Sequence, residues 1–196
     1  MRPLCLLLMV FLWGGDALGA EKPSLAGRML VAAEKLRDPY FEHAVVYLLE
    51  HDAEGAVGII VNRKVGAGSL ADLVADPNGY LNLNRHVDLY FGGPVAMTKL
   101  FVLHDGSYQG PGTVTSPGGI AMTGEKTIVE VIADGRGPRQ HRFMTGYAGW
   151  GAGQLEGEIS HGDWLDAPPD RALIFESTGT TEEIWRQALD KAGLTL

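Results

Sequence analysis

A few residues in this sequence have the types and spacing of a binding site. Dense glycine permits a positive φ or a close approach of the backbone to a ligand, and the free N–H groups of such turns can hold an anion. Aromatic rings can supply flat apolar walls, and amide and guanidinium groups can supply polar contacts. We therefore predict a small-ligand or anion site formed by Asn62, Arg63, Gly92, Gly93, Pro94, Gly146, Tyr147, Gly149, Trp150, Gly151 and Gln154. The alternative, in which these glycines only let a helix pack tightly on a sheet, remains open.

Several catalytic patterns fail on their spacing. The dinucleotide fingerprint needs a third glycine where Gln154 stands, and Glu125 interrupts the P-loop-like segment 119–127. The sequence has no Gly-x-Ser-x-Gly elbow, and its six histidines form no His-Glu-x-x-His pair. The sequence therefore identifies no catalytic residue and predicts no metal and no cofactor.

Composition argues against nucleic acid as a partner. The 196 residues carry a net charge of −8, and such a surface repels phosphate backbones. Cys5 is the only cysteine, and it lies in the segment that export would remove. We expect an unidentified small ligand or a protein as the partner.

The first twenty residues have the pattern of a signal peptide. Arg2 precedes an uncharged run from 4 to 13, and an Ala17-x-Gly19 cleavage pattern follows. The sequence predicts a signal peptide at 1–20, one domain at 21–196, export to the periplasm and no stable membrane span in the mature chain. A start codon assigned upstream of a cytoplasmic protein is the alternative.

The elements that would position these residues form a single compact α+β domain, because strand runs are punctuated by short helices without strict alternation. The glycine-rich stretch is expected to turn from a strand into a helix, and Thr180 with Glu183 predicts a capping box. Helices are expected to follow caps at Ser69, Thr123 and Thr180, and a further helix is expected at 154–160. Strands are expected at 28–33, 43–51, 56–61, 87–91, 99–104, 120–122, 139–147 and 173–175.

Several long motifs resemble, in order, those of the YqgE/AlgH family. They lie at 38–41, 45–51, 55–63, 92–95, 101–104 and 146–156. The resemblance implies a mixed, barrel-like β-sheet with short helices packed around it. It implies no defined molecular activity, because the family carries only a historical label as a transcriptional regulator linked to alginate synthesis. Family members commonly carry Cys where Leu49 stands, so no thiol chemistry is implied at this position.

Three functions are compatible with these observations. The favoured one is a non-catalytic binding or regulatory module with a small-ligand or anion site. The second is an enzyme that uses His, Glu, Asn and Arg without a thiol. The third is a transcriptional regulator, which the net charge and the expected export disfavour.

Overall fold

The computed structural model describes residues 23–73 and 83–193. Ten strands in this part of the chain form one sheet with the order β10-β1-β2-β3-β9-β6-β8-β7, to which β5 and β4 are joined through β9. The predicted signal peptide at 1–20 lies outside the described residues. The strands are β1 Met29–Ala32, β2 Val45–Asp52, β3 Gly55–Ile60, β4 Lys64–Ser69, β5 His86–Phe91, β6 Val95–Asp105, β7 Thr113–Thr115, β8 Ile120–Thr123, β9 His141–Gly151 and β10 Trp164–Ala167.

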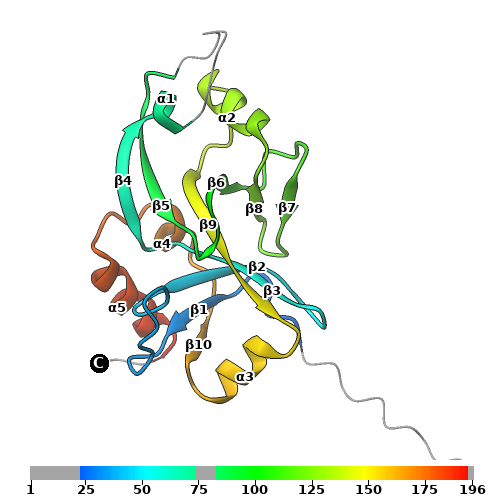
Figure 1. Cartoon of the computed structure of the whole chain (residues 1–196), viewed down its shortest axis with the longest axis vertical. Helices are drawn as coiled ribbons and strands as arrows, with labels where there is room; N and C mark the ends of the chain where they lie inside the picture. The colour runs from blue at the N-terminus through cyan, green and yellow to red at the C-terminus, as the bar shows by residue number, and fades with distance from the viewer. Residues whose placement is uncertain (1–22, 74–82, 194–196) are drawn as a thin grey trace, which may run out of the picture.

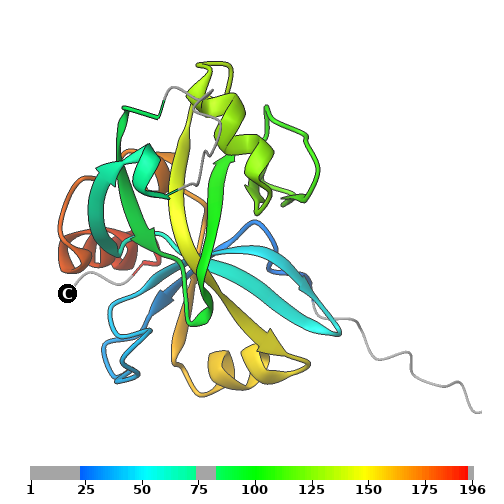
Figure 2. The same cartoon turned by 45° about the horizontal axis from the view of Figure 1, so that its top comes forward.

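Strand β9 joins the two halves of the sheet (Figure 1). Its first part lies between β5 and β6, and its last four residues pair with β3. The β5–β9 pair is parallel and the other strand pairs are antiparallel. In Figure 2, β9 (yellow) runs down the middle of the view, the other strands lie on both sides of it, and the sheet curls. The predicted mixed, barrel-like sheet is confirmed.

Short helices cover the sheet. They are α1 Leu70–Leu73, α2 Lys126–Ala133, α3 Gln154–Ser160, α4 Arg171–Phe175 and α5 Thr181–Lys191. The predicted capping box of α5 is confirmed, because the hydroxyl of Thr180 accepts from the Glu183 N–H and the Glu183 carboxylate accepts from the Thr180 N–H. The apolar face of α5 buries Ile184, Trp185, Ala188 and Leu189. This face closes the largest core cluster, which includes Tyr47 and Leu49 of β2.

Three predicted elements were wrong. Segment 173–175 belongs to helix α4, because the Asp170 side chain accepts from the Leu173 N–H and caps a helical turn. The helix expected at Thr123 begins at Lys126 with Glu125 as its N-cap. Thr123 itself ends β8, where it pairs with both β6 and β7.

The third error concerns the glycine-rich stretch. The expected strand 139–147 continues through Trp150 to Gly151, and the turn into α3 is reduced to residues 152–153. The reason is tertiary: Gly149 and Gly151 lie opposite Val57 and Gly55 of β3. Cross-strand partners therefore keep this segment extended although its glycine content suggests a loop.

Candidate functional site

The structure brings Gly92, Gly93 and Gly146 together where the segment after β5 crosses β9. A Cβ atom at Gly92 would collide with the Gly146 carbonyl oxygen, and one at Gly93 would collide with the Tyr147 backbone. Gly93 and Gly146 also have φ values of 149° and 68°, which favour glycine. These glycines thus allow two segments of the protein's own backbone to approach each other.

The other predicted backbone positions lie on either side of this crossing. Pro94 follows it and is partly buried, and the ring of Tyr147 packs edge-on against Phe101, with 5.8 Å between the ring centroids. Gly149 and Gly151 extend β9 away from the crossing along β3. A Cβ atom at Gly151 would meet no atom within 4 Å, so this glycine is not required by packing.

Trp150 and Gln154 are joined by a residue that the sequence analysis missed, Glu158. Its Oε2 accepts from the indole N–H groups of Trp150 (2.9 Å) and Trp164 (2.8 Å). Its Oε1 accepts from the side-chain amide Nε2 of Gln154 at 2.9 Å. The side-chain Oε1 of Gln154 in turn accepts from the Gly151 N–H at 3.1 Å. The Glu158 carboxylate therefore fastens α3 to β9 and β10. Two tryptophans within eight residues of one helical glutamate were the sequence signal for this contact.

Asn62 forms hydrogen bonds inside the protein. The residue is only 2% exposed. The Oδ1 accepts from the Val45 N–H at 2.9 Å, and the Nδ2 donates to the carbonyl oxygens of His43 (2.8 Å) and Thr181 (3.0 Å). Asn62 thus joins the start of β2 to the start of α5.

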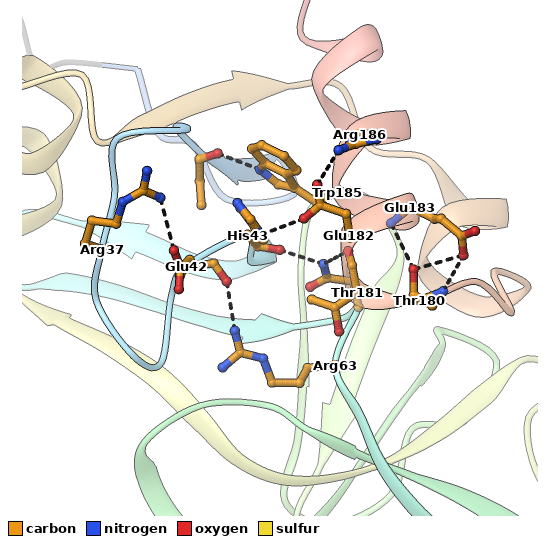
Figure 3. Close-up of polar contacts among 12 residues, drawn as sticks. Arg37, Glu42, His43, Arg63, Thr180, Thr181, Glu182, Glu183, Trp185 and Arg186 are labelled. Atoms are coloured by element: carbon orange, nitrogen blue, oxygen red, sulfur yellow. Dashed lines mark hydrogen bonds and ion pairs between the residues drawn. The ribbon is translucent and has the colours of Figure 1, made fainter. Parts of the chain in front are cut away.

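Arg63 holds the loop that precedes β2 (Figure 3). Its guanidinium donates to the carbonyl oxygens of Tyr40 and Glu42, each at 2.9 Å, and to that of Pro39 at 3.3 Å. It also lies 5.8 Å from the centre of the Phe91 ring. Burial lowers the pKa of Arg63 from its usual value, and nearby carboxylates oppose that effect.

His43 lies near the end of this loop and contacts α5. Its ring stacks on Trp185 with 4.1 Å between centroids, and its Nδ1 lies 2.7 Å from a carboxylate oxygen of Glu182. The other Glu182 oxygen pairs with Arg186 at 2.8 Å (Figure 3). His43 has a φ of 55°, which is uncommon for a residue other than glycine. The stack on Trp185 and the contact with Glu182 hold it there.

A different part of the molecule offers a cleft with unpaired positive charge. The parallel pairing of β5 with β9 covers only Leu89–Phe91 and Phe143–Thr145. The cleft lies at the end of this pairing where the two strands begin. Its volume is about 340 Å³, which is at the small end of ligand sites. The lining residues are Arg85, His86, Val87, Asp88, Tyr90, His141, Arg142, Phe143 and Phe175.

Arg142 is the most constrained cation of this cleft. The residue is 5% exposed, and its guanidinium lies 4.3 Å from the centre of the Tyr90 ring. It donates to the carbonyl oxygens of Val61 and Ser177, each at 2.7 Å. Burial lowers the pKa of Arg142, but a guanidinium starts so high that it stays charged. The sequence signal was a lone charged residue in an otherwise uncharged strand, and the sequence analysis did not use it.

Arg85 and His141 stand beside Arg142 in the cleft lining. Arg85 donates to the Ile132 carbonyl oxygen at 3.3 Å, and no described carboxylate forms an ion pair with Arg85 or Arg142. The Nδ1 of His141 donates to the Pro138 carbonyl oxygen at 3.0 Å. Burial lowers the pKa of His141, the hydrogen bond to Pro138 partly opposes this effect, and the charge of Arg85 lowers the pKa further by a smaller amount.

One acidic side chain lines the same cleft. Asp88 pairs with Lys64 at 2.8 Å, so its negative charge is balanced across the β4–β5 ladder. Across the described part of the chain, no three His, Cys, Asp or Glu side chains converge in a way that could hold a metal ion. Within residues 23–73 and 83–193, no helix has the length and apolar composition that crossing a membrane requires.

Comparison with known proteins places the chain in a family. Residues 29–196 match the AlgH-like family, DUF179. A UPF0301 protein of Methylococcus capsulatus is 44% identical over 171 residues, which cover 87% of this chain and 93% of that protein. A UPF0301 protein of Rhodospirillum rubrum is 39% identical, with 87% and 88% of the two chains covered.

Two solved structures are similar in fold. The solution structure of AlgH from Pseudomonas aeruginosa, also of UPF0301, has a TM-score of 0.74 and 34% identity, covering 89% of this chain and 92% of that one. Protein DIP2367 from Corynebacterium diphtheriae has a TM-score of 0.64 at 22% identity, covering 86% of each chain, and supports the fold alone. With its family motifs in order and most of its length matched, the chain belongs to the AlgH-like UPF0301 family.

Proposed function

We propose that this protein is a non-catalytic binding module that holds a small anion in the cleft between the starts of β5 and β9. The observation that carries the proposal is that Arg85 and Arg142 line the same cleft and that no described carboxylate forms an ion pair with either of them. Arginine is the side chain best suited to carboxylate and phosphate groups, because its planar N–H donors match their geometry.

The charge of the whole chain strengthens this proposal. A net charge of −8 creates a potential that repels anions. A site for an anion must therefore bring positive side chains together locally, and two of the nine lining residues, Arg85 and Arg142, are arginines. Arg142 is also held in place before any ligand binds, by two carbonyl oxygens and the Tyr90 ring. Such preorganisation lowers the cost of binding.

The site predicted from the glycine-rich stretches remains a separate prediction. Its polar side chains Asn62, Arg63 and Gln154 are engaged in hydrogen bonds within the protein. Arg85 and Arg142 also donate within the protein, but they line one cleft together, which gives this cleft better support. The functional groups of Arg85 and Arg142 are hydrogen-bond donors, which favours binding over catalysis.

Calorimetric titration with inorganic phosphate and with citrate tests the proposal. Arg85→Ala should weaken binding about tenfold or more, since a charged hydrogen bond contributes about 1.5–3 kcal/mol. Arg37→Ala is the matched control, because it removes the same charge from a loop residue paired with Glu42 that does not line the cleft. Equal weakening by the two substitutions, or no binding of either anion by the native protein, would overturn the proposal.

A further inference from the structure

The cleft contains a hydrogen-bond acceptor beside its donors. A carbonyl oxygen can only accept, so the contact between the Nδ1 of His141 and the Pro138 oxygen places the ring proton on Nδ1. In the neutral imidazole the Nε2 is then an acceptor. Burial lowers the pKa of His141 and so favours this neutral form near pH 7.

The Nε2 of His141 is not fully buried, and His141 lines the cleft. Among the described residues, every fully buried side-chain nitrogen or oxygen has a hydrogen-bond partner. The Nε2 has no such partner there, whereas the Nδ1 is occupied by Pro138. Because His141 lines the cleft, its free acceptor is available to a bound molecule. An acceptor beside two arginines is suited to a ligand that carries both a negative charge and a hydrogen-bond donor.

We propose, building on the function proposed above, that the anion bound in this cleft carries a hydroxyl group close to its charged group, as hydroxycarboxylates and sugar phosphates do. Arg85 and Arg142 bind the anionic group, and the His141 Nε2 accepts the hydroxyl proton in a hydrogen bond. Lys64 pairs with Asp88 at 2.8 Å and so offsets part of the negative charge beside the arginines. The rings of Tyr90 and Phe175 contribute apolar lining for the carbon atoms of a small ligand.

Matched pairs of probes test the hydroxyl requirement on the native protein. L-malate is compared with succinate, and glycerol 3-phosphate with n-propyl phosphate, so each pair differs in hydroxyl groups only. The hydroxylated member should bind about three- to tenfold more tightly, the ratio that one hydrogen bond supports. The pair that binds more tightly shows whether the charged group is a carboxylate or a phosphate.

His141→Phe tests the residue assigned to the hydroxyl. This substitution keeps an aromatic ring and removes the acceptor, so the preference for the hydroxylated probe should be lost while the affinity for succinate or propyl phosphate is retained. His161→Phe is the matched control, because His161 is exposed at the end of α3 and does not line the cleft. It should leave the preference unchanged.

Each failure has a distinct meaning. Equal binding of both members of each pair by the native protein would overturn the hydroxyl proposal and leave the anion site standing. A preference that survives in a folded His141→Phe variant would also overturn it, since the acceptor would then be another group. If none of the four probes binds, the proposed anion-binding function itself fails. Because the first comparison uses the native protein, the test does not depend on the variant folding.

Discussion

The carboxylate of Glu158 explains the roles of Trp150 and Gln154, which the sequence suggested as ligand contacts. Trp150 and Trp164 are 5% and 3% exposed, and both indole N–H groups donate to the same Oε2. A buried N–H group without an acceptor is costly, so this carboxylate satisfies two groups at once. Trp150 and Gln154 thus have a structural role that depends on Glu158.

We predict that Glu158→Ala lowers the free energy of unfolding by about 2–4 kcal/mol, because it leaves two indole donors without a charged acceptor. Urea unfolding followed by circular dichroism measures this loss. Glu158→Gln, which keeps one oxygen acceptor, should lose less. Glu34→Ala, at an exposed loop position, is the control and should change stability by no more than about 0.5 kcal/mol. Equal stability of the two alanine variants would show that the indole hydrogen bonds contribute little.

At the scale of elements, the crossing of β9 by the segment after β5 organises the sheet. The Gly92 N–H donates to the Thr145 carbonyl oxygen at 2.8 Å, and the Gly92 carbonyl accepts from the Ile60 N–H at 2.8 Å. Gly92 therefore links β9 to β3 through backbone hydrogen bonds. Its missing side chain is what allows the backbone of Gly146 to lie so close.

Gly92→Ala should lower the free energy of unfolding by about 3 kcal/mol or more, since the added methyl group would force apart two backbones in the core. Gly151→Ala is the matched control, because its Cβ atom would meet open space and its φ is not positive. That variant should be unchanged or slightly more stable. A Gly92→Ala protein with native stability but no ligand binding would instead favour the ligand site predicted at the glycines.

At the scale of the whole molecule, two histidines whose pKa is lowered by full or partial burial make stability depend on pH. His104 is fully buried, with its Nδ1 2.6 Å from the Asp105 carbonyl oxygen and its Nε2 2.9 Å from the Thr123 hydroxyl. Burial lowers the pKa of His104, and it likewise lowers the pKa of His141. The unfolded chain therefore binds more protons than the folded chain at mildly acidic pH.

The sign of this effect follows from linkage. The contribution of these histidines is complete above the unfolded pKa, about 6.5, and is lost as pH falls from there towards the lowered folded pKa. We expect the free energy of unfolding to fall between about pH 7 and pH 5. His104→Gln should flatten this slope, measured by urea unfolding at several pH values, whereas the exposed control His161→Gln should not. The same slope in both variants would contradict the assignment to His104.

Patterns within a few residues were enough to identify several elements. The capping box at Thr180 and Glu183 marked the start of α5, and apolar residues on both faces marked the paired strands β2 and β3. Both signals are local, because a cap satisfies N–H groups of its own helix and alternation reports the faces of its own strand. The long motifs identified the family and, through it, the curled sheet. The boundaries near 123 and 147 were wrong because cross-strand partners outweighed local preference, whereas segment 173–175 was wrong because its local helix cap, Asp170, was missed.

The sequence alone therefore determined the α+β class, the family and most elements, but the role of each chemical group was decided by the tertiary structure. Asn62 reaches Thr181, 119 residues away, and Arg142 reaches Val61, 81 residues away. Which donor meets which acceptor over such separations depends on how the strands cross, and no spacing in the sequence encodes that crossing. For the same reason, only the folded chain brings Arg85 and Arg142 into one cleft, where positive charge gathers in an acidic protein.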